Sequence, residues 1–283
     1  TALQNEGANG AVTFALRPGT YTGQYLLDTV PGTPGTITLT AADPEAELPV
    51  LSYAANNAED NYILRIDGVA DVHLEHLHFL PTGATRGRAV VFRNAADGLR
   101  IQHCRFDGPV DPTPNLNDYT AITCDQTDVG ENANPQGITI TDNDFHGGLV
   151  AMELEFRLGT PRSADLLISG NRLFHQLRGG IAVQNASGTI HGNTIRTQQG
   201  QWFFGIRCMR FTNGSAITGN HLRIRTEMNG TGIEHSNAFN DADLIANNSV
   251  LMESFGDGEV NGLVLFNTSG LLVAHNTVAI TPH

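Results

Sequence analysis

Residues 215–224 read SAITGNHLRI, in which an aliphatic residue is followed by asparagine three positions later and by a second apolar residue two positions after that. The same phrase returns as ITITDNDF (138–145), LLISGNRL (166–173), GTIHGNTI (188–195), LIANNSVL (244–251) and LVAHNTVA (272–279). Most copies lie about 27 residues apart, a spacing typical of stacked structural repeats. The phrase therefore predicts a repeat architecture.

A second apolar phrase precedes each copy of the first, for example AITC (121–124), GIAV (180–183), GIRC (205–208) and GIEH (232–235). These short segments are joined by Gly, Asn and Asp and show no 3.6-residue periodicity, which indicates strands and excludes helical repeats. One repeat cannot bury its own apolar face, but repeats stacked about 4.8 Å apart form parallel sheets around a continuous core. We therefore predict an all-β fold, a single-stranded right-handed parallel β-helix (β-solenoid) of about eight coils.

Equivalent residues of successive coils lie above one another in a β-helix. The asparagine of the phrase would then form a ladder whose side-chain amides donate and accept hydrogen bonds along the stack. Leu77 and Cys104 occupy this position in the first two repeats, so the ladder begins in the third. Its predicted members are Asn143, Asn171, Asn193, Asn220, Asn248 and Asn276.

The composition restricts the possible partners. The chain has 283 residues, a net charge of −13 and sixteen basic residues that are all arginine, so nucleic acid is disfavoured as a partner. No apolar run is long enough to span a bilayer. The cysteines, Cys104, Cys124 and Cys208, are too few and too dispersed for a disulfide framework or a zinc site, and we expect buried thiols.

The first coils resemble a known superfamily. AVTFALRPGTYTGQYLL (11–27), GTPGTITLTAADPEAELPVLS (32–52) and YILRIDGVADVHLEHLHF (62–79) are similar to the opening coils of pectate-lyase-like right-handed β-helices, especially the chondroitinase B and alginate lyase branch and secreted bacterial β-helix-repeat proteins. The resemblance implies an extracellular or bacterial cell-surface protein that holds or cuts acidic polysaccharide. Lyases of the chondroitinase B type use a Lys and an Arg, and this chain has no Lys.

The resemblance also implies an N-terminal cap, so we expect a cap remnant and the first strand within residues 1–20. A single β-helix domain is predicted over residues 1–283, as part of a longer chain. Loop insertions are predicted at 107–136 and 155–164, where the repeat is interrupted. The last coil ends in NTVAITPH without a cap, and its open strand edges favour self-association.

One face of the predicted helix carries the candidate catalytic residues. If Ile122, Ile181, Ile206 and Ile233 point inward, the two-residue alternation of strands sends their neighbours outward. The resulting candidates are Arg207, Glu234, Asp125, Glu153 and Arg93. Glycosidase chemistry needs two carboxylates about 5 to 10 Å apart, a distance spanned by one or two coils. Alternatively, the face has no catalytic function, and Arg207 and Glu234 form an ion pair on the solvent-exposed surface.

Other candidates concern metals and carbohydrate. No cofactor is required. The resemblance to the pectate lyase branch implies Arg207 or Arg93 as an Arg base, and with it a Ca²⁺ ion for which Asp125, Glu153 and Glu155 are the nearest ligand candidates. His76, His103 and Asp142 share one register and are weak candidates for metal ligands. Trp202 and Phe203 are carbohydrate-binding candidates, because three consecutive aromatic residues cannot all be buried on one side of a strand.

These observations favour an extracellular or cell-surface β-helix module with an adhesive, structural or carbohydrate-binding role. Its partner would be a polysaccharide or a cell-surface glycan. The alternative is a polysaccharide lyase or glycosidase that acts on acidic polysaccharide.

Overall fold

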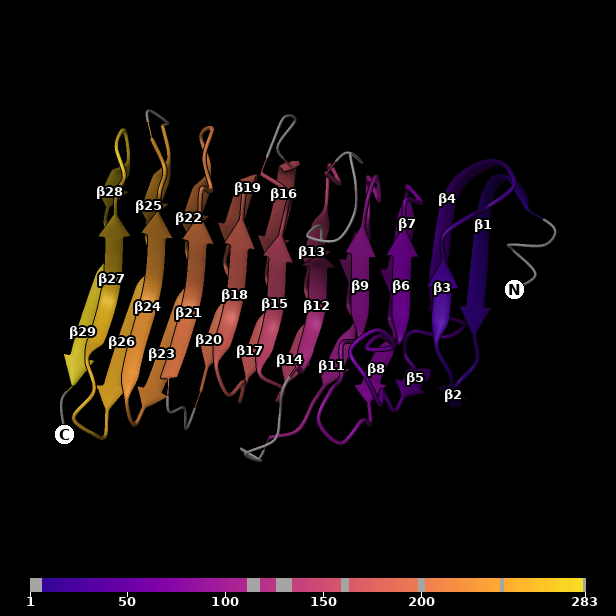
Figure 1. Ribbon diagram of the computed structural model, residues 1–283, viewed down its shortest axis with the longest axis horizontal. Helices are drawn as coiled ribbons and strands as arrows, with labels where there is room; N and C mark the ends of the chain where they lie inside the picture. The colour runs from indigo at the N-terminus through magenta and orange to yellow at the C-terminus, as the bar shows by residue number, and fades with distance from the viewer. Residues whose placement is uncertain are drawn as a thin grey trace.

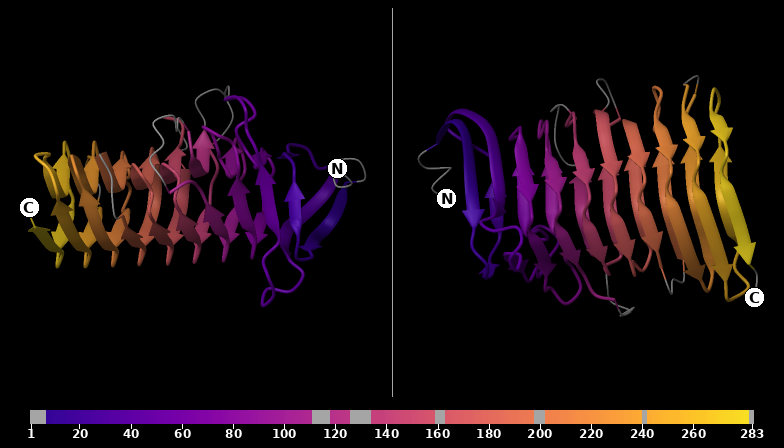
Figure 2. Two further views of the ribbon diagram at one scale, coloured as in Figure 1. Left: turned by 90° about the horizontal axis from the view of Figure 1, so that it is seen from below. Right: turned by 180° about the vertical axis from the view of Figure 1, so that it is seen from behind.

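The computed structural model describes residues 7–110, 118–125, 134–158, 163–197, 202–239 and 242–281. These residues wind into a right-handed parallel β-helix, in which each complete coil contributes one strand to each of three sheets and the last turn contributes β28 and β29 (Figure 1). Figure 2 shows the coils stacked along the long axis, with β1 at one end and β29 at the other. The described residues contain no helix, and therefore none that could cross a membrane.

The three sheets are named A, B and C in the order in which the chain enters them. Sheet A contains β1 (Ala8–Leu16), β4 (Gly32–Ala41), β7 (Val72–Glu75), β10 (Arg100–Gln102), β13 (Thr139–Thr141), β16 (Ser163–Ser169), β19 (Ala186–His191), β22 (Ala216–Thr218), β25 (Leu244–Ala246) and β28 (Leu272–Ala274). Sheet B contains β2 (Thr20–Thr22), β5 (Val50–Tyr53), β8 (His78–Pro81), β11 (Arg105–Asp107), β14 (Asp144–His146), β17 (Arg172–Phe174), β20 (Thr194–Arg196), β23 (His221–Thr226), β26 (Ser249–Ser254) and β29 (Thr277–Thr281). Sheet C contains β3 (Tyr25–Leu27), β6 (Leu64–Asp67), β9 (Val90–Arg93), β12 (Thr120–Asp125), β15 (Val150–Glu155), β18 (Gly179–Gln184), β21 (Trp202–Met209), β24 (Asn229–Ser236) and β27 (Val260–Phe266).

The fold confirms the predicted β-helix and adds coils to it. The first repeated phrase marks the coils from β7 onward, and the second phrase begins with YILRI (62–66) at β6, so the coils before that point are not marked by the repeat. The first predicted loop, 107–136, is divided by β12, so it forms two connections on either side of that strand. Residues 1–6 and parts of both predicted loops lie outside the described residues.

The asparagine ladder is present in the turn between sheets A and B. The Oδ1 atom of each ladder member from Asn171 onward accepts hydrogen bonds from the backbone and side-chain amides of the preceding member, at 2.8 to 3.0 Å. Each Nδ2 also donates to a backbone carbonyl of the preceding coil, as Asn193 does to Ile168 at 3.0 Å. Cys104 joins the end of the ladder, because its backbone N–H donates to Asn143 Oδ1 at 2.9 Å.

Aliphatic and aromatic columns fill the interior. The rings of Phe79, Phe106 and Phe145 stack from coil to coil, with centroids 5.1 and 4.7 Å apart. In sheet C, Gly205 lies within β21, where a Cβ atom would approach the Gly232 carbonyl oxygen to 2.5 Å. This close approach of two coils explains why the second apolar phrase begins with glycine in GIRC and GIEH.

The last coil exposes the side chains that interior coils bury. Within the described residues no further coil stacks on β27, β28 and β29. The exposed apolar side chains in this coil are Leu265, Phe266, Leu272, Val273, Val278 and Ile280.

A buried ionisable pair lies between sheet C and the following turn. His235 Nε2 is 3.8 Å from Asp243 Oδ2, and both side chains are almost completely buried. The same nitrogen lies 3.0 Å from the Phe211 carbonyl oxygen, which can only accept, so Nε2 carries a proton and donates it to that bond. Burial lowers the pKa of His235 below its ordinary value of 6.5, although the Phe211 carbonyl and Asp243 raise it.

This pair predicts a loss of stability in mild acid. The unfolded chain binds a proton at the histidine below the ordinary pKa of 6.5, whereas the folded protein resists protonation of His235. The stabilisation is therefore complete above that pKa and decreases as the pH falls toward the lower pKa of the folded state. Denaturant unfolding at about pH 7.5 and about pH 5.5 measures the difference.

The matched variant for this experiment is His235→Leu, because Leu265 occupies the same column in the next coil. His235→Leu should reduce the pH dependence, while His221→Leu, at an exposed position of β23, should leave it unchanged. An unaltered pH dependence in His235→Leu would contradict the assignment.

Candidate functional site

A groove of about 690 Å³ lies along the edge where the chain enters sheet C. Its walls come from five successive coils, containing β9, β12, β15, β18 and β21, and from the turns that precede those strands. Four coil steps correspond to a length of roughly 19 Å along the helix axis. The lining residues are Arg86, Arg88, Asp118, Thr120, Leu149, Val150, Glu153, Arg178, Trp202, Phe204 and Arg207.

Arginine dominates the charge of the groove. Four arginines and two carboxylates line it, although the whole chain has a net charge of −13. Arg86 and Arg178 form no ion pair within the described part of the chain. The groove is therefore a locally basic surface on an acidic protein, and it favours a ligand that carries negative charge.

One wall of the groove is held by a buried amide. Arg88 Nε lies 2.9 Å from Asp118 Oδ2, and Asn61 Nδ2 donates to the same oxygen at 2.9 Å. Asn61 Oδ1 in turn accepts the backbone N–H of Arg88 at 3.0 Å. Asn61 is almost completely buried, so it fixes both charged residues in place.

An aromatic corner closes the opposite end. Trp202 and Phe204 face outward on β21, and Trp202 is 48% exposed. The Arg207 guanidinium lies 5.0 Å from the Trp202 ring centroid and 4.2 Å from that of Phe204, while Arg207 Nε donates to Glu234 Oε2 at 3.0 Å. These contacts hold Arg207 and Trp202 in one orientation. Phe203 points inward and is 1% exposed, as Ile206 also is at 0%. Two inward residues three positions apart show that the two-residue alternation of sides is interrupted between them, around Gly205.

The structure places the predicted catalytic residues in different surroundings. Glu153 and Arg207 line the same groove and lie two coils apart, about 10 Å by the coil spacing. Arg93 instead pairs with Asp67 at 2.6 Å and is not part of the groove. Asp125 pairs with β15 through its backbone, and its side chain lies outside the described residues.

Sequence reasoning missed Arg86, Arg88, Arg178 and Phe204. The three arginines stand immediately before sheet C strands, in RGRAV and LRGG. Aligning the turns before the second apolar phrase, as well as the strands, would have found them. Strict alternation from the inward Ile206 would place Phe203 outward, whereas the interruption around Gly205 turns Phe203 into the core and Phe204 toward the groove.

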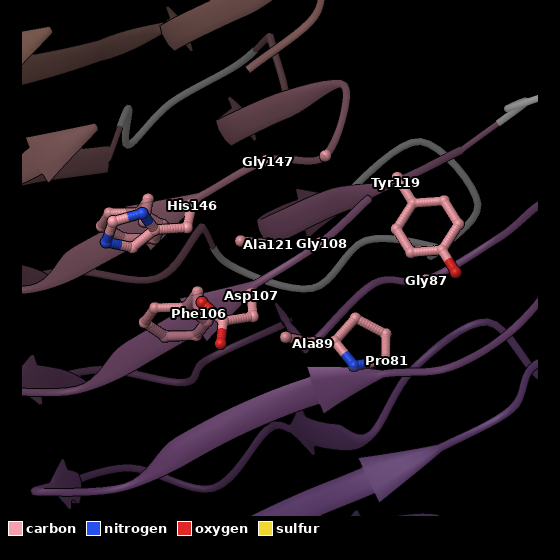
Figure 3. A pocket seen from close by; sticks show the side chains of 12 residues that line it. Pro81, Gly87, Ala89, Phe106, Asp107, Gly108, Tyr119, Ala121, His146 and Gly147 are labelled. Carbon is pink, nitrogen blue, oxygen red and sulfur yellow. The ribbon is translucent and has the colours of Figure 1, made fainter. Parts of the chain in front are cut away.

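A second, smaller cavity lies between sheets B and C (Figure 3). Pro81, Phe106, Tyr119 and His146 are among its lining residues, and the Tyr119 hydroxyl donates to the Gly83 carbonyl. The free volume is about 10 Å³, which accommodates no more than one water molecule. This cavity is part of the packing and cannot take an organic ligand.

The predicted metal ligands lie in the turn between sheets A and B. His76, His103 and Asp142 each precede a ladder position and have left-handed backbone φ values of 52°, 53° and 55°, a conformation for which His, Asp and Asn are enriched. The rings of His76 and His103 stack with centroids 5.1 Å apart. Among the residues that the structure describes, no three His, Cys, Asp or Glu side chains are grouped to hold a metal ion.

The chain is similar in sequence or fold to several known proteins. Residues 86–279 match the family described as NosD, periplasmic copper-binding protein. Two crystal structures of the GH136 lacto-N-biosidase from Eubacterium ramulus align with TM-scores of 0.53 and 0.50, at 10% and 11% identity, over 95% of this chain and 62% of that one. The surface protein and adhesin PfbA of Streptococcus pneumoniae aligns with a TM-score of 0.35 at 10% identity, over 97% of this chain and 93% of that one.

No curated protein matches the sequence. The chain spans 62% of the length of the lacto-N-biosidase, and at 10% identity that likeness concerns the fold alone.

Among the described residues, no group of imidazole, thiolate and carboxylate side chains is brought together to hold copper. Copper in proteins is held by imidazole, thiolate and thioether ligands. The thiols of Cys104, Cys124 and Cys208 are completely buried, and burial raises the pKa of Cys104 to about 12, so the thiolate form is suppressed. His76 and His103 have no third His, Cys, Asp or Glu grouped with them among the described residues.

Proposed function

The chain belongs to the NosD family, and we propose that this member is a saccharide-binding β-helix of the periplasm or the cell exterior. Its ligand is an acidic polysaccharide, bound lengthwise along the groove of sheet C. The description of the family as periplasmic supports the location. The observation that carries the proposal is the combination of four arginines with a half-exposed tryptophan in one elongated groove.

Each part of the groove suits one feature of such a ligand. Arginine binds carboxylate and sulfate groups through paired, charge-assisted hydrogen bonds. A flat aromatic ring packs against the apolar face of a sugar, and Trp202 keeps one face against Arg207 while almost half of its surface is open to solvent. The length of the groove across five coils suits an extended chain rather than a single small molecule.

The second candidate function is cleavage of the bound polysaccharide. The observation in its favour is that Glu153 lines the groove together with the arginines. The geometry for hydrolysis is less favourable. Glu153 and Glu234 are three coils apart in register, roughly 14 Å, whereas glycosidase carboxylates lie about 5 to 10 Å apart. We therefore place binding before catalysis.

A panel of polysaccharides tests the proposal. Polygalacturonate, alginate and chondroitin sulfate are compared with neutral dextran for binding by calorimetry. We expect at least one acidic polysaccharide to bind, and Trp202→Ala to weaken that binding by about tenfold or more, the loss of roughly 1.5 kcal/mol. Phe239→Ala is the matched control, because Phe239 is equally exposed but lies outside the groove.

The same mixtures are assayed for unsaturated products and for new reducing ends, with and without Ca²⁺. Turnover that is abolished by Arg207→Ala would establish the catalytic alternative. Absence of binding to every acidic member of the panel would contradict the proposed function.

A further inference from the structure

The turns that lead from sheet B to sheet C form one wall of the groove, and equivalent turns follow in the coils beyond it. The connection from sheet B to sheet C contributes a lining residue in each of four coils, and in the fifth coil Trp202 is the first residue of β21, directly after that connection. In the next two coils the same connection carries Met228 and Phe255, which are 52% and 38% exposed. The backbone register joins these coils directly, since Trp202 pairs with Asn229 and Phe255 N–H donates to the Thr226 carbonyl at 3.0 Å.

Phe255 repeats the arrangement found at Trp202. The Arg225 guanidinium lies 4.4 Å from the Phe255 ring centroid, and Arg225 Nε lies 3.0 Å from Glu253 Oε2. The corresponding unit in the groove consists of Trp202, Arg207 and Glu234. In both units an arginine covers one part of an aromatic ring, and a glutamate at the paired position of the strand one coil farther along holds that arginine.

The second unit is also braced from the neighbouring coil. Arg223 Nη2 lies 2.8 Å from Glu253 Oε1, so Glu253 holds two arginines with its two oxygens. These contacts restrict the position of Arg225, and through it the position of the Phe255 ring. A ring held in this way loses little conformational entropy when a ligand stacks on it.

We propose that Phe255 is a second saccharide-stacking platform, which binds the continuation of the chain held in the groove. The inference rests on the proposed function, because it takes the same ligand. Phe255 lies two coils beyond Trp202, roughly 10 Å farther along the helix axis, and Met228 forms an apolar step between them. Short oligosaccharides bind only in the groove, whereas longer ones also reach Phe255.

The test measures how affinity depends on the length of the ligand. Size-fractionated oligomers of polygalacturonate, alginate and chondroitin sulfate are titrated into the wild-type protein, Phe255→Ala and Phe255→Trp. We expect affinity to rise with length in the wild type. Phe255→Ala should bind long oligomers with about tenfold lower affinity than the wild type and short oligomers with the same affinity. Phe255→Trp should keep the increase of affinity with oligomer length. Phe239→Ala again serves as the matched control, and circular dichroism verifies the fold of each variant.

The outcomes separate the two proposals. If no acidic oligomer of any length binds the wild type, the proposed function is contradicted and this inference falls with it. A second outcome is that oligomers bind, that Trp202→Ala weakens their binding, and that Phe255→Ala has the affinity of the wild type at every length. In that case only the second platform is contradicted. The same conclusion follows if Phe255→Ala weakens short and long oligomers equally.

Discussion

Replacing Asn193 with alanine is expected to destabilise the fold by roughly 3 to 5 kcal/mol, because it removes a completely buried rung of the ladder. Asn193 Oδ1 accepts from the backbone and side-chain amides of Asn171 at 3.0 and 2.9 Å, and its Nδ2 donates to the Ile168 carbonyl at 3.0 Å. The variant leaves these groups without partners in a region that water does not reach. Chemical denaturation followed by circular dichroism measures the loss.

Asn276→Ala is the control for this prediction, since the same residue type occupies the same turn in the last coil but is half-buried. Water can replace its hydrogen bonds, so the expected loss is a fraction of that for Asn193→Ala. Equal denaturation midpoints for Asn193→Ala and the wild type would show that the ladder does not stabilise the coils.

Reversing the charge of Arg178 is expected to abolish most of the binding of acidic polysaccharide. Arg178 lines the groove and has no ion-pair partner among the described residues, so its charge is available to a ligand. Arg178→Glu replaces an attraction by a repulsion, and we expect a loss of about tenfold to a hundredfold in affinity. Calorimetric titration with the acidic ligand that binds most tightly, at low and high salt, measures this loss of affinity and how far salt screens the electrostatic interaction.

Arg196→Glu is the matched control for the net charge of the protein. Arg196 is an exposed arginine at the end of β20 in sheet B and is not part of the groove. This variant has the same total charge as Arg178→Glu, so long-range repulsion affects both equally. A similar loss of affinity in the two variants would show that net charge, rather than the groove, governs binding.

The sequence was sufficient to predict the coil architecture because its repeats constrain one another. An Asn at one register in six coils is meaningful only if the coils stack, and the ladder of hydrogen bonds confirms this. The two coils built from β1 to β6 do not show the repeated phrase, because their spacing is irregular. Their strands β1 and β4 pair through a bulge between Gly10 and Val12, an irregularity that a periodic pattern does not reveal.

The candidate site was predictable only in part, because it lies at a turn whose register the strand pattern does not specify. The one-coil spacing of Arg207 and Glu234 correctly indicated an ion pair, since both lie on regular strands. Arg86 and Arg178 precede their strands, where the number of residues in the turn varies from coil to coil. Their approach to one groove depends on how each turn folds.

Fluorescence of the single tryptophan gives the most direct test of the central claim, because the only Trp in the chain is Trp202 and it lies in the groove. The protein is titrated with acidic polysaccharide and, separately, with neutral dextran, while Trp emission is followed. We predict a saturable change with an acidic polysaccharide, weakened by salt and absent with dextran. An emission spectrum that stays constant while calorimetry shows the acidic polysaccharide to be bound would place the ligand elsewhere and contradict the account.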